Sequence, residues 1–224
     1  MNDSEILAFC SQFTMGSIQR QKQTLQSINH VVQNNVQGDI IEIGVWKGGM
    51  IMIMLLKLMQ LGITDRKVHL YDTFTGMTEP SVEDVCRLGQ ASNLGDLVKC
   101  ECAFDNVYAN VLSTGYPIDN ITFHKGDIRL IDPNIDVPSK IAVLRLDNDW
   151  FELYKFELPV FEPNVQINGI ITIDDYGYWN GCKKAIDAYL ELLDYNVCIT
   201  QIDDCGIYWY KLANSFCSLL MHTL

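Results

Sequence analysis

Short β-branched runs and longer apolar segments alternate along most of the chain. The run Ile40 to Ile43 ends at Gly44, the apolar segment Met50 to Leu61 follows, and a second run from Lys67 to Tyr71 leads into Asp72. Runs of this length predict buried strands, and the segment between them is long enough for a helix. The pattern therefore predicts a βαβ unit.

The alternation resumes in the second half of the chain. It predicts strands at Ile121 to Lys125, Ile141 to Leu146 and Gly169 to Ile173, helices near Phe151 to Phe161 and Gly181 to Leu193, and a closing antiparallel pair at Asn196 to Gln201 and Gly206 to Lys211. A helix-like stripe from Ser17 to Asn34 is expected to pack on the domain or on a partner subunit. The order predicts a doubly wound, mostly parallel α/β sheet.

The length of 224 residues suits one domain with extra helices. We expect a single domain over 1–224, with an N-terminal helical segment at 1–37. Residues 73–120 interrupt the alternation and are expected to form a lid or substrate region. With 48% hydrophobic and 20% charged residues, the composition excludes a disordered chain, a coiled coil and a collagen-like repeat.

The net charge is −12, from 16 basic and 28 acidic residues. This acidity disfavours nucleic acid and anionic membrane surfaces as partners, and it is compatible with a divalent cation or a cationic small molecule. The longest apolar run, Met50 to Met59, is about half the roughly 20 residues that span a bilayer. The polar N-terminus lacks a signal-peptide pattern, and the eight cysteines are expected to be reduced thiols. We therefore expect a cytoplasmic protein.

The turn after the first strand carries Glu42, Gly44 and Gly48 in an E-x-G-x-x-x-G pattern. Its glycines let a ligand approach the backbone at a helix start, and the acidic residue fits a positively charged ligand such as a sulfonium amino acid. The dinucleotide fingerprint G-x-G-x-x-G is not met, because Trp46 stands where its second glycine would be.

Two further carboxylates follow strands. Asp72 ends the second predicted strand, where an acidic residue can accept hydrogen bonds from ribose hydroxyls or cap a turn. Asp127 follows the strand that ends near Lys125, and it could face an adenine edge or serve as a turn residue. The sequence leaves both alternatives open for each residue.

The densest acidic group is Asp147 and Asp149 after one strand, with Asp174 and Asp175 after the next. Carboxylates at neighbouring strand ends repel one another unless a cation lies among them, and such oxygen ligands suit Mg²⁺. The alternative is a set of solvated turn acids in which Asp175 caps the following helix. We favour the metal site, because Leu146 and Ile173 bring both pairs to one edge of a buried sheet.

These motifs carry a resemblance to a known family. Glu42 to Gly49, Tyr71 to Gly76, Leu144 to Asp149 and Ile173 to Tyr176 resemble, in order, the motifs of the macrocin and mycinamicin deoxysugar O-methyltransferases, a family that includes the novobiocin sugar methyltransferase. The resemblance runs from about residue 38 to 211. It implies a class I S-adenosylmethionine-dependent methyltransferase fold, which is Rossmann-like, and an acceptor that is a deoxyhexose hydroxyl of a glycan or glycosylated natural product.

The resemblance also implies roles for individual residues. Mg²⁺ is expected on Asp147, Asp174 and Asp175, and Asp149 is expected to be the general base. S-adenosylmethionine is expected at Glu42, Gly44 and Gly48, with its ribose on Asp72 and its adenine near Asp127. The alternatives are methylation of a catechol or other phenol, and a binding protein without catalysis. The intact acidic residues Asp147, Asp149, Asp174 and Asp175 speak against the latter.

Overall fold

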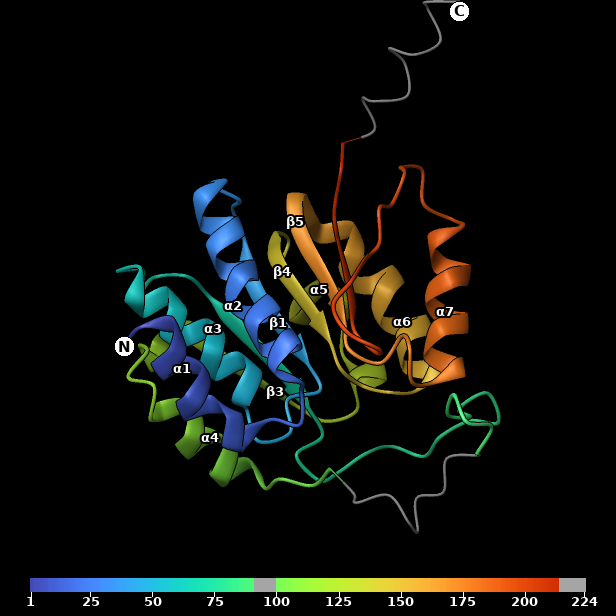
Figure 1. Ribbon diagram of the computed structural model, residues 1–224, viewed down its shortest axis with the longest axis horizontal. Helices are drawn as coiled ribbons and strands as arrows, with labels where there is room; N and C mark the ends of the chain where they lie inside the picture. Colours follow the sequence, from blue (N-terminus) through green and yellow to red (C-terminus); the bar gives the residue numbers. More distant parts are fainter. Residues whose placement is uncertain (91–99, 214–224) are drawn as a thin grey trace, which may run out of the picture.

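The computed structural model describes residues 1–90 and 100–213. Within them, one seven-stranded sheet has the strand order β3-β2-β1-β4-β5-β7-β6 (Figure 1). Its strands are β1 (Asp39–Ile43), β2 (Val68–Asp72), β3 (Ile121–Lys125), β4 (Ile141–Leu146), β5 (Val165–Ile173), β6 (Thr200–Gln201) and β7 (Ile207–Tyr210). Strands β1 to β5 are parallel, and β7 runs antiparallel to β5 and β6. The predicted mostly parallel sheet with antiparallel C-terminal strands is confirmed.

Helices cover both faces of the sheet (Figure 1). The helices are α1 (Asp3–Cys10), α2 (Ile18–Gln33), α3 (Gly49–Gln60), α4 (Phe104–Leu112), α5 (Pro133–Asp136), α6 (Phe151–Phe161) and α7 (Asn180–Leu190), with short 3-10 turns at Ser11–Phe13, Ile118–Asn120, Ile128–Leu130 and Glu162–Asn164. Buried side chains of α2, α3 and α4 pack on one face, and those of α6 and α7 pack on the other. Helix α1 lies outside α3.

The central strands are apolar on both faces because each face carries helices. In β1, Ile40 packs toward α2 and α3, whereas its neighbour Ile41 packs toward α6 and α7. The same division separates Val143 from Leu144 in β4. Successive side chains of a strand point to opposite faces, so burial on both sides requires the continuous apolar runs seen in the sequence.

The structure corrects several expected boundaries. Strand β5 begins at Val165 rather than Gly169, and α7 ends at Leu190 rather than Leu193. Of the strand expected at 196–201, only Thr200 and Gln201 pair, and both are exposed at the edge of the sheet. Within the N-terminal helical segment expected at 1–37, the pattern specified only the helix from Ser17 to Asn34. The structure adds α1, at whose start Asn2 and Glu5 form a capping box.

The carboxyl ends of the parallel strands meet at one edge of the sheet. The chain order reverses between β1 and β4, whose neighbours β2 and β5 lie on opposite sides. In open α/β sheets, ligands bind in the crevice at such a switch point. No helix among the described residues is long and apolar enough to cross a membrane.

Candidate active site

A cavity of about 530 Å³ opens at these strand ends. Most of the residues singled out from the sequence line it, namely Glu42, Gly44, Asp72, Asp127, Asp147, Asp149, Asp174 and Asp175. Gly48 does not line the cavity. It precedes α3 with a left-handed φ of +89°, which suits glycine and lets the turn enter the helix.

The turn after β1 is packed against the acidic loop after β4. Gly44 has φ +81°, and a Cβ at this position would overlap the carbonyl oxygen of Asp147. The sequence suggested that glycine here leaves room for a ligand. The structure gives a second reason, which is the close approach of two backbone segments.

Asp72 fixes the conformation of this turn. Its Oδ2 accepts hydrogen bonds from the amides of Val45 (2.7 Å) and Trp46 (2.9 Å), and its Oδ1 accepts one from Phe74 (2.7 Å). Asp72 is therefore a turn-capping residue that also lines the cavity. The capping alternative is confirmed, and ribose binding by the same carboxylate stays a prediction.

Asp127 is held by a neighbouring arginine. Arg129 donates to it from Nε (2.9 Å), and the Asp127 carboxylate also accepts from the Arg129 amide (3.0 Å). These hydrogen bonds lower the pKa of Asp127, so the residue is a carboxylate at neutral pH. Its contact with an adenine edge stays a prediction.

The acidic cluster forms because β4 and β5 are adjacent and parallel, with Leu146 beside Ile173. The next residues, Asp147, Asp174 and Asp175, offer carboxylate oxygens that all lie within 4.8 Å of one another. Asp174 and Asp175 are buried, whereas the side chain of Asp147 is 30% exposed. The predicted meeting of these three aspartates is present in the structure.

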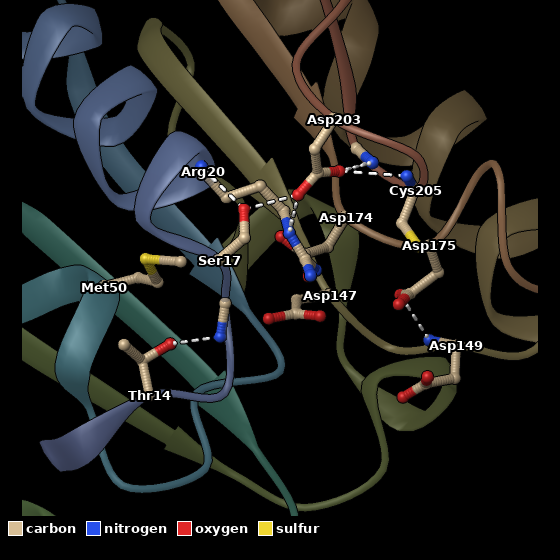
Figure 2. Close-up of polar contacts among 12 residues, drawn as sticks. Thr14, Ser17, Arg20, Met50, Asp147, Asp149, Asp174, Asp175, Asp203 and Cys205 are labelled. Carbon is tan, nitrogen blue, oxygen red and sulfur yellow. Dashed lines mark hydrogen bonds and ion pairs between the residues drawn. The ribbon is translucent and has the colours of Figure 1, made fainter. Parts of the chain in front are cut away.

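Two arginines pair with this cluster, and one of them, Arg20, is labelled in Figure 2. Arg145, on β4 and only 2% exposed, donates to Asp147 (2.8 Å), Asp174 (2.5 Å) and Glu42 (3.3 Å). Arg20 reaches in from α2 and pairs with the other oxygen of Asp174. Sequence analysis assigned neither arginine a role. The sequence could have pointed to Arg145, because a charged residue inside a buried strand requires partners. No feature of the sequence pointed to Arg20.

The arginines do not offset all of the negative charge. Burial, followed by repulsion from Asp147, raises the pKa of Asp149 to about 7 and that of Asp174 to about 6. Burial also raises the pKa of Glu42 to about 8, despite its pairing with Arg145. An additional cation would relieve the part of these shifts that comes from repulsion between carboxylates.

Asp149 is held by three features. Its backbone has the left-handed φ of +63°, its amide donates to Asp175 Oδ2 (3.2 Å), and its Oδ1 accepts the indole N–H of Trp179 (2.8 Å). Trp179 is buried against Trp150, with ring centroids 5.0 Å apart. The structure adds a hydrogen bond to the candidate base.

The N-terminal segment forms one wall of the cavity. Phe13, Thr14, Met15 and Gly16 line it together with Arg20. A Cβ at Gly49 would lie 2.6 Å from the Phe13 carbonyl, which shows how closely this segment packs on the start of α3. The sequence predicted the helix after this wall but not that the segment reaches the site.

The expected lid is partly docked. The amide of Arg87 donates to the Tyr178 carbonyl (2.8 Å), and the amide of Asn180 donates to the Val85 carbonyl (2.9 Å). Asp84 accepts from the Phe151 amide (2.8 Å). This part of 73–120 is therefore tied to the starts of α6 and α7, while residues 91–99 of the expected lid lie outside the described residues.

The fold, the glycine turn and the polar strand ends define a class I S-adenosylmethionine-dependent methyltransferase. The family model for macrocin O-methyltransferase (TylF) matches residues 9–211. The chain belongs to this family and is an O-methyltransferase.

Characterised relatives agree with this assignment. The chain is 29% identical over 206 residues to demethyldecarbamoylnovobiocin O-methyltransferase of Streptomyces niveus, covering 88% of this chain and 75% of that protein. It is also 29% identical over 211 residues to 8-demethyl-8-(2,3-dimethoxy-alpha-L-rhamnosyl)-tetracenomycin-C 4'-O-methyltransferase of Streptomyces olivaceus, covering 92% and 78%. The solved structure of the O-methyltransferase NovP superimposes with a TM-score of 0.77 at 29% identity, covering 90% and 83%.

Proposed function

We propose that the protein transfers the methyl group of S-adenosylmethionine to a sugar hydroxyl of a glycosylated small molecule, in a reaction that depends on Mg²⁺. The observation that carries the proposal is the single cavity that holds the glycine turn, the three-aspartate cluster and Asp149. The names of the relatives support the acceptor class, because the one from Streptomyces olivaceus methylates a rhamnosyl group.

The residues of the acidic cluster fit a divalent cation. Asp147, Asp174 and Asp175 offer the hard oxygen donors that Mg²⁺ prefers. Repulsion from Asp147 is, after burial, the second cause of the raised pKa of Asp174. The Asp147 carboxylate accepts a hydrogen bond from Arg145 at Oδ2, and the Asp175 carboxylate accepts from the Asp149 amide and the Tyr154 hydroxyl at Oδ2. When bound, the ion would supply positive charge that stabilises the acceptor oxygen as it loses its proton.

The chain's own residues perform the remaining tasks. Asp72 holds the turn at Val45 and Trp46, where the cofactor would lie, and Glu42 and Gly44 shape its methionine end. Asp149 accepts the proton of the acceptor hydroxyl, and Trp179 keeps that carboxylate in place. Positioning and charge stabilisation provide most of the rate enhancement.

The cysteines support a cytoplasmic location for this reaction. Among the described residues, the buried Cys10, Cys86 and Cys182 and the exposed Cys198 are all free thiols. Free thiols persist in reducing compartments, whereas secreted proteins commonly form disulfides.

A mass-spectrometric screen tests the proposed function. The protein is incubated with S-adenosylmethionine, Mg²⁺ and a panel of deoxyhexosides, with catechols and simple phenols as the competing acceptor class. The proposal expects a methylated product from at least one glycoside, and product formation roughly 10²- to 10⁴-fold slower in the same reaction with Asp149→Asn. Products from the phenols alone would contradict the sugar assignment.

A further inference from the structure

We propose that Arg20 acts as a resident cation of the metal site, so that a divalent ion and the Arg20 guanidinium compete for Asp174. The inference rests on the metal site of the proposed function. It assigns Arg20 the role of a positioning residue, which acts through Asp174 and through the N-terminal wall of the cavity.

Asp174 is already shared between two guanidinium groups. Its Oδ1 accepts from Arg145 Nη2 (2.5 Å), and its Oδ2 accepts from Arg20 Nη1 (Figure 2). The Asp174 residue is only 4% exposed, so water contributes little to satisfying it. A metal ion that takes Asp174 as a ligand must therefore approach an oxygen that an arginine already uses.

Of the two arginines, Arg20 is the one that can give up its ion pair with Asp174. Arg145 is fixed in the central strand β4 and also pairs with Glu42 and Asp147, so leaving Asp174 would not free its side chain. Arg20 enters from α2, its side chain is 17% exposed, and it has a second partner in Asp203.

Asp203 gives Arg20 a charged partner outside the metal cluster. Arg20 Nε donates to Asp203 Oδ2 (2.9 Å), and the amides of Cys205 (2.9 Å) and Gly206 (2.8 Å) hold the other oxygen, Oδ1. Arg20 can thus withdraw from Asp174 while it stays paired, which avoids leaving a buried charge alone.

The same contacts link Arg20 to the cavity wall. Ser17 caps α2 by accepting the Arg20 amide (3.1 Å), and its hydroxyl donates to Asp203 (Figure 2). The segment just before Ser17, from Phe13 to Gly16, lines the cavity. Coupling between two binding events is reciprocal. Metal binding at Asp174 should therefore loosen the packing of this wall, and a loosened wall should favour metal binding.

Electrostatics fixes the sign of the effect. A guanidinium and a divalent ion on one buried carboxylate repel each other in a region of low effective dielectric. Removing the charge of Arg20 should therefore tighten metal binding, whereas a general disruption of the site would weaken it. The sign distinguishes the two explanations.

The test is a titration with Mn²⁺, a paramagnetic substitute for Mg²⁺, followed by electron paramagnetic resonance. We expect Arg20→Met to bind Mn²⁺ at least tenfold more tightly than the unmodified protein, and Arg20→Lys to stay near the original affinity. Lys22→Met is the matched control, because it removes one positive charge from an exposed position on the same helix. Its affinity should change less than twofold.

Hydrogen exchange supplies the second readout. Saturating Mn²⁺ should speed exchange in residues 13–20 of the unmodified protein, and it should leave the already faster exchange of Arg20→Met unchanged. Suppose that Arg20→Met unfolds cooperatively but binds Mn²⁺ no more tightly than Lys22→Met does. This result would overturn the inference about Arg20 and leave the proposed metal site standing. If the unmodified protein binds no Mn²⁺, or if Asp174→Ala binds it as tightly as the unmodified protein, the proposed metal site fails and the inference fails with it. Arg20→Gln, which keeps a donor toward Asp203, repeats the titration if the Met variant does not fold.

Discussion

Gly44 packs directly on the backbone of Asp147, so the turn after β1 and the acidic loop after β4 form one unit. The glycine turn that we assign to the cofactor therefore also sets the position of a candidate metal ligand. A substitution at Gly44 should disturb both functions.

Gly44→Ala should lower the free energy of unfolding by roughly 2–4 kcal/mol, through left-handed strain and overlap with Asp147. Gly62→Ala is the matched control, because Gly62 has φ +74° but nothing within 4 Å of an added Cβ. It should lower stability by only about 1 kcal/mol. Urea unfolding measures both variants, and equal losses would show that the contact with Asp147 is unimportant.

Trp179→Phe should reduce kcat roughly 10- to 100-fold, because Asp149 loses the donor that orients it. Affinity for S-adenosylhomocysteine, measured by calorimetry, should stay unchanged. The comparison variant is Trp150→Phe, which loses an indole hydrogen bond to the Thr78 carbonyl instead. An equal loss of kcat in both variants would contradict the assignment of Trp179 as the residue that orients Asp149.

Arg145→Met should lower stability by about 3–5 kcal/mol, the usual effect of leaving buried charges without their partner. Saturating Mg²⁺ should restore part of this loss, since it supplies positive charge to Asp147 and Asp174. Lys155→Met, which breaks an exposed pair with Glu152, should change stability by less than about 1 kcal/mol. Denaturant unfolding with and without Mg²⁺ measures the free energy of unfolding of each variant. If Mg²⁺ does not stabilise Arg145→Met, the result would argue against a metal site near Asp147 and Asp174.

Glu157 should make stability depend on pH. It is fully buried and accepts a hydrogen bond from Asn148 (2.6 Å), and burial raises its pKa from 4.5 to about 8. Between these values the folded state holds a proton that the unfolded state has released, so stability falls as pH rises, by up to roughly 1.4 kcal/mol per pH unit.

Glu157→Gln should therefore flatten the decline in stability between about pH 5 and pH 8, because glutamine has no proton to retain. Thermal unfolding across this range tests the difference between the two proteins. Glu152→Gln on the same helix, where Glu152 is exposed, should leave the decline as it was. A parallel decline in wild type and Glu157→Gln would mean that Glu157 titrates normally.

The sequence predicted the features that depend on local pattern. The apolar runs that became β1, β4 and β5 are continuous because both faces of each strand are covered, and this gave the sheet and its polar carboxyl ends. From these ends, Asp147 and Asp174 could be expected together, because they follow neighbouring parallel strands.

The missed features depend on contacts between distant segments. Arg20 meets Asp174 across 154 residues, and Ser17 meets Asp203 across 186. No local periodicity encodes such pairs. The indole bond from Trp179 to Asp149 likewise depends on a turn whose left-handed conformation at Asp149 is not evident from the residue type.

We assign metal binding and proton transfer to different aspartates. The most direct test is the rate of methyl transfer to an accepted glycoside, measured by mass spectrometry as Mg²⁺ is increased. Asp174→Ala should be slow at low Mg²⁺ and recover partly at high Mg²⁺, since it lacks one ligand. Asp149→Asn should stay roughly 10²- to 10⁴-fold slow at every Mg²⁺ concentration, the range for a lost general base. Rescue of Asp149→Asn by Mg²⁺, or a wild-type rate for Asp174→Ala without it, would contradict the account.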